Sequence, residues 1–239
     1  MKKIIAVAVA GLALSTGAFA GTFDGVNADL GLGGAYTNAK NSNLSLIPTE
    51  NFANATPYGG TTSSGDFAGI ASLGYSQEIG QGFNLAANLF YVIGHQRAGS
   101  GGNSGTNQDV NGDYISWNQG VSNKLNNTWG ISVEPGYYFG KDTLGYVKLA
   151  WVNSNLNTSA NMGAVNDTNP SSPYGGPTSG STSNNINGFG YGLGVKQAIT
   201  ENIYLKGEVF GVSYGKVNVA DGSVQPSQVA AFLSVGYKF

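Results

Sequence analysis

The chain has 239 residues, with 38 glycines, no cysteine, one histidine and 10% charged residues. Lys and Arg number 11 against 13 Asp and Glu, so no basic surface exists for a nucleic-acid backbone. Without cysteine, disulfides, thiolate nucleophiles and cysteine-ligated metal sites are excluded. An aromatic content of 11% is too high for a disordered chain, so the composition favours a glycine- and aromatic-rich all-β protein.

Residues 1–20 have the pattern of a secretory signal peptide. Two lysines at positions 2 and 3 precede an apolar run over 4–14, and Ala-Phe-Ala at 18–20 is a small-x-small cleavage site. The run is too short to cross a bilayer as a helix, and no later stretch approaches 18 consecutive apolar residues. We therefore expect a cleaved signal peptide, 1–20, followed by one domain, 21–239, that is not a helical membrane protein.

The domain shows alternation with period two rather than helical spacing. Phe83, Leu85, Ala87 and Leu89, for example, are separated by residues of mixed polarity. A period of two with one uniformly apolar face is typical of a strand whose two sides contact different solvents. The pattern predicts eight strands, at 26–36, 67–76, 83–93, 129–139, 144–152, 188–196, 203–213 and 229–239.

The connections between these strands alternate in length. Short ones fall near 78–82, 140–143 and 198–202, whereas long ones, rich in Gly, Ser, Thr and Asn, fall near 38–64, 95–127, 153–187 and 215–227. A compact soluble domain rarely carries several long loops, but an outer-membrane barrel has short periplasmic turns and long outer loops. Within the second long loop, we expect 110–126 to form a short hairpin.

Aromatic side chains recur eight positions apart on the apolar face of three strands. Eight residues at a rise of about 3.3 Å and a tilt of about 40° span roughly 20 Å along a barrel axis, near the roughly 25 Å apolar band between two aromatic girdles. Core aromatics of a soluble β-sandwich are the alternative interpretation. The residues predicted to form the girdles are Phe67, Tyr75, Phe83, Tyr91, Trp129, Tyr137 and Trp151.

Closure of the sheet follows from the apolar faces. In hydrocarbon every backbone N–H and C=O group must pair internally, so strands can span a membrane only as a closed barrel. Eight strands enclose an interior that side chains can fill. The predicted fold is therefore all-β, an eight-stranded antiparallel up-and-down transmembrane β-barrel with short turns at one end and long loops at the other.

The last fifty residues carry a family resemblance. GFGYGLGVKQAITENIYLKGEVFG, at 188–211, resembles the penultimate hairpin of small OmpA-like and opacity-type outer-membrane β-barrel proteins, and AFLSVGYKF, at 231–239, resembles their closing strand. The resemblance implies location in a Gram-negative outer membrane, contact with its lipid and lipopolysaccharide, and a terminal signal for the barrel-assembly machinery, here Tyr237 and Phe239. Unlike in full-length OmpA-type proteins, we expect no peptidoglycan-binding domain.

The predicted facing of the strands directs seven charged side chains into the barrel. With a tight turn at 140–142, Glu134 and Lys148 would lie directly opposite each other. Unpaired charges in a lumen of low dielectric are costly, so we expect an ion-paired network that fills the lumen. A charged constriction in a narrow pore is the alternative. The network predicted comprises Asp29, Glu134, Lys148, Lys196, Lys206, Glu208 and Lys238.

Candidate chemistry outside the lumen is weak. For His95, the single histidine, no nearby residue stands out among many serines as the nucleophile or carboxylate of a triad, and no Gly-x-Ser-x-Gly elbow accompanies it. The segment 107–112 imitates the start of a calcium loop, but Asn118 occupies the twelfth position, where a bidentate Glu belongs. We therefore assign no catalytic, metal-binding or cofactor-binding residue and no cofactor.

The long loops are the part of the sequence that could determine which ligand the protein binds. They are polar and punctuated by Tyr58, Tyr114, Trp117 and Tyr174, a composition that suits adhesion, as in antibody loops, and equally an inert coat. We expect a monomeric, non-enzymatic protein with a structural or interaction role at the cell surface, adhesin- or antigen-like, with a possible extracellular ligand. The alternatives are a narrow passive channel for small solutes and an outer-membrane lipid-modifying enzyme.

Overall fold

The computed structural model describes residues 21–44, 58–108, 114–162, 166–167, 178–219 and 222–239. The expected signal peptide, 1–20, lies outside this part of the chain. Every regular element within the described ranges is a β-strand. Among the described residues, no helix has the length and hydropathy needed to cross a membrane.

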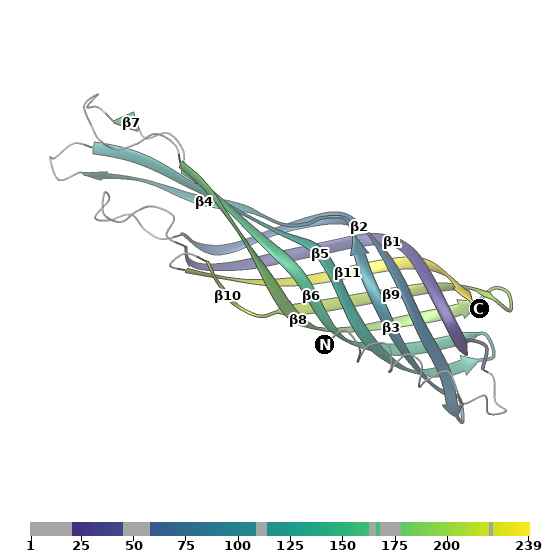
Figure 1. Ribbon diagram of the computed structural model, residues 1–239. Coiled ribbons are helices and arrows are strands. Elements are labelled where there is room, and N and C mark those ends of the chain that lie inside the picture. The colour runs from purple at the N-terminus through teal and green to yellow at the C-terminus, as the bar shows by residue number, and fades with distance from the viewer. Residues whose placement is uncertain (1–20, 45–57, 109–113, 163–165, 168–177, 220–221) are drawn as a thin grey trace.

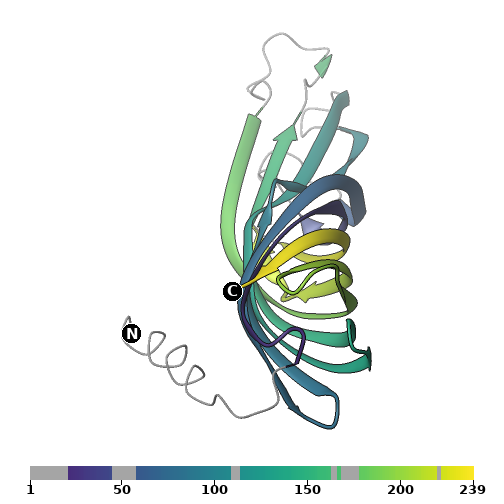
Figure 2. The ribbon, with the colours of Figure 1, turned by 90° about the vertical axis from the view of Figure 1, so that its right-hand side faces the viewer.

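The strands form one antiparallel sheet that closes on itself (Figure 1, Figure 2). Around the ring, β1, β2, β3, β5, β6, β8, β9 and β11 pair in chain order, and β11 returns to β1 with Asn27 opposite Lys238 and Ser42 opposite Ser223. The elements are β1 (Gly25–Leu44), β2 (Tyr58–Gly80), β3 (Phe83–Ile93), β4 (Gln96–Gln108), β5 (Tyr114–Gly140), β6 (Thr143–Met162), β7 (Asn166–Asp167), β8 (Thr178–Ala198), β9 (Ile203–Tyr214), β10 (Val217–Val219) and β11 (Gly222–Lys238).

Three of the eleven elements continue other strands or add to them, and are not separate strands of the barrel. β4 continues β3 beyond Gly94, whose φ of 107° bends the chain as few residues other than glycine can, and both elements pair with β5. β10 likewise continues β9, since both pair with β11, and β7 pairs only with the far end of β5. The predicted eight-stranded up-and-down barrel is therefore confirmed.

Six of the eight strands are longer than predicted, whereas β3 (Phe83–Ile93) and β9 (Ile203–Tyr214) keep the predicted bounds to within one residue. β5 has 27 residues and β6 has 20, so most of the described parts of 38–64, 95–127 and 153–187 are paired β-structure and not loops. The predicted hairpin within 110–126 is also wrong, because residues 114–125 form one arm whose partner is β4. Alternation reveals a strand only where one face meets an apolar phase, whereas these extensions are polar on their outer faces and are held by backbone hydrogen bonds.

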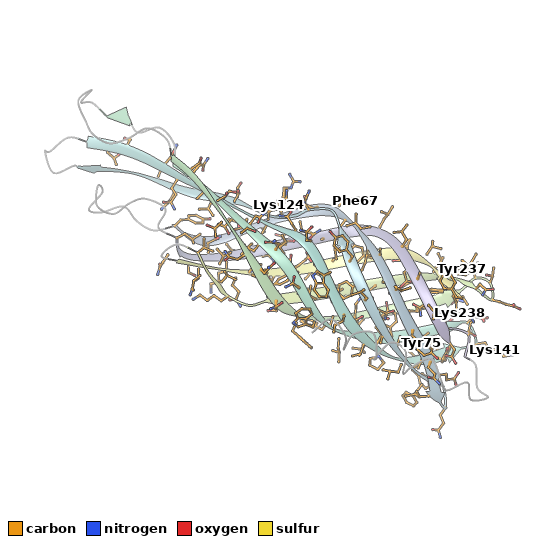
Figure 3. The ribbon with its side chains drawn as sticks, viewed as in Figure 1. Phe67, Tyr75, Lys124, Lys141, Tyr237 and Lys238 are labelled. Carbon is orange, nitrogen blue, oxygen red and sulfur yellow. The ribbon has the colours of Figure 1, made fainter. Side chains whose placement is uncertain are left out.

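The two ends of the barrel differ. Short connections join the strands at the turn end, where Lys141 and Lys238 lie, and β4, β5, β6 and β8 reach furthest at the opposite, hairpin end (Figure 1, Figure 3). We call their projecting parts, 96–108, 114–128, 152–162 and 178–188, the outer sheet. The 11 residues that separate Trp151 from Met162 on β6 correspond to roughly 28 Å along the axis.

Large exposed apolar side chains are confined to the half of the wall next to the turn end. Wherever the structure describes the exposure of a side chain, those that are large, apolar and exposed fall within 26–36, 67–93, 129–151, 189–209 or 229–239. Leu89 and Val133 are typical, with about half of their surface exposed (52% and 49%) although their neighbours in sequence are buried. Such an inverted surface, apolar outside and polar inside, is that of a membrane-spanning barrel, and we call this surface the lipid belt.

Aromatic side chains border the lipid belt at two levels. Tyr91 pairs with Trp129 across β3 and β5, and eight residues away Phe83 pairs with Tyr137, with ring centroids 5.2 Å apart. Of the seven residues predicted for the girdles, six are exposed and Tyr75 is half-buried on the same outward face. Figure 3 shows Phe67 nearer the hairpin end and Tyr75 nearer the turn end of the wall.

Candidate functional site: the filled lumen and the outer sheet

Six charged side chains meet in the middle of the lumen. Lys148 Nζ lies 2.8 Å from Glu208 Oε1 and 3.7 Å from Glu134 Oε1, and Lys196 Nζ lies 3.5 Å from Glu134 Oε2. Lys206 Nζ lies 3.1 Å from Asp29 Oδ2. The three cations and three anions balance, and each side chain is at most 3% exposed. The pairing of β5 with β6 follows the predicted register, with Val133 opposite Leu149.

Hydroxyl groups complete the coordination of the buried carboxylates. Asp29 accepts hydrogen bonds of 2.5 Å from both Ser72 Oγ and Tyr204 Oη, and Glu208 accepts one of 2.7 Å from Tyr146 Oη. Tyr204 thereby fills the Asp29 oxygen that Lys206 does not contact, and Ser72 adds a second donor to the oxygen that Lys206 does contact, which lowers the cost of burying this carboxylate. The six charges therefore compensate one another, and Glu134 Oε2, which accepts no hydrogen bond, is met only by the ammonium of Lys196 at 3.5 Å.

Glycines opposite the tyrosines make room for their rings. A Cβ atom at Gly194 would lie 2.2 Å from Cζ of Tyr146, and one at Gly236 would lie 2.1 Å from Cζ of Tyr204. Two phenylalanines, Phe90 and Phe210, cover the cluster on another side, with Lys148 Nζ 4.4 Å and 5.0 Å from their ring centroids. The large aromatic rings thus fill the interior at the positions where glycines on the facing strands leave space for them.

Lys238, the seventh residue predicted for this network, does not belong to it. It lies near the end of β11 at the turn end, and its Nζ donates a 2.9 Å hydrogen bond to the carbonyl oxygen of Thr22. The alternation correctly predicts that Lys238 faces inward, but Lys238 lies closer to the turn end than the charged cluster does. Without Lys238 the predicted excess of one cation disappears.

Residues 21–24 close the turn end of the lumen, and we call them the N-terminal plug. Phe23 is 3% exposed and packs between the rings of Tyr138 and Tyr204, at centroid distances of 5.9 and 5.6 Å. The backbone nitrogen of Phe23 donates to Tyr138 Oη at 3.2 Å, and Thr22 Oγ1 donates to the carbonyl oxygen of Lys141 at 2.7 Å. The start of the described chain is therefore tied to strands on several sides of the barrel.

The hairpin half of the lumen is filled as well. Leu44, Leu125 and Leu156 have no exposed surface, and Tyr58, expected on a loop, is 8% exposed in the same core. Polar side chains cross the interior from β5 to β1: Asn123 Nδ2 donates to Asn41 Oδ1 at 2.8 Å, and Gln119 donates to the carbonyl oxygen of Leu44 at 3.0 Å. The described barrel is thus packed at both ends and in the middle.

Rows of carboxamide side chains lie just beyond the aromatic border on the outward face of β5, β6 and β8. Asn126, Asn155 and Asn185 face one another across the three strands, and Asn153 and Asn187 form the next row, above Trp151 and Phe189. Asn153 Nδ2 donates to Asn187 Oδ1 at 2.9 Å. We call these five residues the asparagine rows. They mark where the wall changes abruptly from apolar to polar.

A shallow polar groove of about 630 Å³ crosses the outer sheet further out. Four strands contribute to it, and its lining contains no charged residue. Its polar side chains are those of Ser100, Ser122, Ser159, Asn161, Ser179 and Ser181, and Val121, Ala160 and three glycines complete the lining. Neutral donors and acceptors on a rigid sheet suit recognition of an uncharged, hydroxyl-rich ligand.

His95 directly precedes β4 of the outer sheet, and among the described residues it takes part in no catalytic arrangement. It is exposed, and its Nδ1 is 2.7 Å from Oδ1 of Asn126. Nearby, Asp66 pairs with Arg97 at 2.7 Å. Within the described residues no group of three His, Cys, Asp or Glu side chains could hold a metal ion, and most of the calcium-like segment, 109–112, falls outside those residues.

Sequence reasoning missed the N-terminal plug and the outer core. The signal available for the plug was Phe23, an apolar residue placed before the first alternating run. Nothing in the sequence indicates that Asn41 and Asn123 would meet, because they are 82 positions apart and each sits in a polar segment.

The arrangement defines a class of protein, a small eight-stranded membrane β-barrel with a filled lumen. No family model matches the sequence, and no curated protein is similar to it. Among solved structures, Ail of Yersinia pestis, crystallised with sucrose octasulfate, is 12% identical, with 90% of this chain and 99% of Ail covered at a TM-score of 0.35. The N-terminal barrel of Pseudomonas aeruginosa OprF is 16% identical (90% and 98% covered, TM-score 0.38).

The protease OmpT of Escherichia coli is 10% identical, with 94% of this chain and 100% of OmpT covered at a TM-score of 0.39. These three proteins differ in their named roles, and all three TM-scores are low. The geometry of this chain alone therefore indicates its function.

Proposed function

We propose that the protein is a non-enzymatic surface protein of a Gram-negative outer membrane. In this proposal the barrel is an anchor and the outer sheet is the surface that contacts an extracellular ligand. The turn end faces the periplasm and the hairpin end faces outward, since bacterial barrels have short periplasmic turns. The observation that carries the proposal is the outer sheet, which extends paired β-structure and an uncharged polar groove well beyond the lipid belt.

The chemistry of the groove favours an uncharged saccharide as the ligand. Serine hydroxyls and the Asn161 carboxamide both donate and accept hydrogen bonds, as sugar hydroxyls do. The groove lining has no charge that would attract an ionic partner. Its strands are held by continuous ladders, so little conformational entropy would be lost on binding.

A glycan array of uncharged oligosaccharides, probed with the detergent-purified barrel, tests this proposal. We expect binding that Ser122→Arg abolishes, because an arginine in the groove would displace a neutral ligand. Lys141→Ala, at the turn end, is the matched control and should bind like the unaltered protein. Absence of binding to every glycan, or equal binding by the Ser122→Arg variant, would refute a role for the groove.

The second candidate is a narrow passive channel, which the buried charges of the lumen favour. The N-terminal plug and the outer core argue against it, because fully buried side chains fill both ends of the described lumen. Single-channel recording in planar bilayers separates the two candidates. We expect no conductance steps above background, and regular steps would favour the channel.

An enzymatic role is the remaining alternative, and it would centre on His95. The exposed pairing of His95 with Asn126 supplies neither a nucleophile nor a carboxylate orienter. We expect that lipid and peptide hydrolysis by the purified protein will equal that of His95→Ala. A loss of hydrolysis in this variant would replace our proposal with an enzyme.

We further propose that the asparagine rows contact the polar headgroups and lipopolysaccharide of the outer leaflet, since they directly follow the aromatic border of the lipid belt. Tyr237 and Phe239 are outward-facing and 47% and 73% exposed at the end of the chain, where the barrel-assembly machinery could read them. Within the lipid belt the ring of strands is closed and offers no edge for pairing with a second copy, which supports a monomer. The free edges of the described sheet, for example along β4 and along 178–187 of β8, lie beyond the belt.

A further inference from the structure

Two carboxyl groups lie beside Gly21: that of Asp24 contacts its backbone nitrogen, and that of Glu78 lies next to its Cα position. This nitrogen donates a 2.8 Å hydrogen bond to Asp24 Oδ2, and the other oxygen of Asp24 accepts a 2.6 Å hydrogen bond from the backbone nitrogen of Glu78. A Cβ atom at position 21 would lie 2.6 Å from Glu78 Oε2 and 2.5 Å from Tyr138 Oη. The position is therefore shaped for glycine and surrounded by acceptors.

The sequence immediately before Gly21 is the small-x-small cleavage pattern Ala-Phe-Ala. Hydrolysis of the bond between Ala20 and Gly21 adds one water molecule, which leaves a carboxylate on Ala20 and an α-ammonium on Gly21. The nitrogen that now donates as an amide would then carry a full positive charge at the same place.

We propose that removal of residues 1–20 creates a latch, in which the α-ammonium of Gly21 forms an ion pair with Asp24 beside Glu78 and fixes the N-terminal plug in the turn end of the barrel. The plug then closes the lumen firmly only after residues 1–20 have been removed. This inference is independent of the ligand proposed for the outer sheet.

The electrostatics around Asp24 support such a partner. Burial raises the pKa of the Asp24 carboxyl above its usual value; the backbone donors of Gly21 and Glu78 offset part of this effect, and the Glu78 carboxylate adds to it. Lys238 offsets only a further part of the effect. A carboxylate in these surroundings is under-compensated, and an ammonium 2.8 Å away would supply the missing charge.

The latch predicts a defined pH dependence. An α-amino group ordinarily titrates at about 7.7–8.0, and an ion pair raises its pKa in the folded state. Its contribution to stability is therefore fully present below about pH 7.7 and is lost as the pH rises through the raised value. The other charged or titratable side chains around the plug are Glu78, Tyr138, Lys141, Tyr204 and Lys238.

The test uses the full chain, exported and purified from outer membranes, with its N-terminal residue identified by mass spectrometry. The variants are an insertion of two serines between Ala20 and Gly21, which moves the ammonium away, Asp24→Asn, and both together. Asp142→Asn, in another turn at the same end, is the control. The midpoint of heat unfolding is read from gel mobility at pH 7 and pH 9.5.

We expect Gly21 as the first residue of the purified protein. At pH 7 the insertion should lower the midpoint by about 2–4 °C, and at pH 9.5 this difference should vanish. In Asp24→Asn the insertion should have no further effect. A different first residue, equal midpoints with and without the insertion at pH 7, or an equal effect of the insertion in the Asp24→Asn background would each overturn the latch.

Discussion

Replacement of Glu208 by glutamine tests whether the lumen is held by its charge balance. Glu208 contacts Lys148 at 2.8 Å, Lys206 at 3.8 Å and the Tyr146 hydroxyl at 2.7 Å. Glutamine has nearly the same shape, but three buried cations would then face two carboxylates. The variant therefore changes charge with little change of packing.

The expected loss of unfolding free energy depends on which ion pairs each lysine retains. Removing one partner of a buried ion pair costs about 3–5 kcal/mol. Lys148 keeps Glu134 at 3.7 Å and Lys206 keeps Asp29 at 3.1 Å, so the loss should lie at the lower end, about 3 kcal/mol. With a urea slope of about 2 kcal/mol/M, the unfolding midpoint should fall by about 1.5 M.

Urea unfolding of the protein in phospholipid vesicles, followed by tryptophan fluorescence, measures this shift. Glu201→Gln, at an exposed turn position, should leave the midpoint unchanged. Lys148→Met combined with Glu208→Gln restores neutrality and should be more stable than Glu208→Gln alone. An unshifted midpoint for Glu208→Gln, or a double variant whose loss is the sum of two single losses, would refute charge balance as the basis of the cluster.

Three further predictions concern the wall and the packing. Val133→Arg places a cation in the lipid belt and should cost about 2–4 kcal/mol in a vesicle refolding titration, whereas Ser159→Arg on the outer sheet should cost little; equal costs would contradict the assigned facing. Gly194→Ala should displace the Tyr146 ring and cost about 1–3 kcal/mol, whereas Gly207→Ala, which has no atom within 4 Å of the added carbon, should be tolerated. In intact cells, a cysteine at Ser159 should react with a water-soluble maleimide and one at Val133 should not, and the reverse outcome would invert the placement of the membrane.

The sequence predicted the number of strands, their order and their facing. Alternation around Leu89 and Val133 is legible because lipid on one side selects apolar residues at every second position, and the side facing the lumen carries no such demand. The opposition of Glu134 and Lys148 was also predictable, because a tight turn sets the register of a hairpin.

Other features depended on the tertiary structure. The length of the strands beyond Trp151, the contact of Asn41 with Asn123 and the sealing of the lumen by Phe23 arise from residues far apart in sequence that carry no periodic signal. The local sequence pattern shows only whether a side chain faces lipid, water or the lumen. Which distant side chains contact one another in the lumen depends on how the strands close into a ring. For the same reason Lys238 has the facing of a lumen residue, and only the height at which the barrel ends separates it from the other six charges.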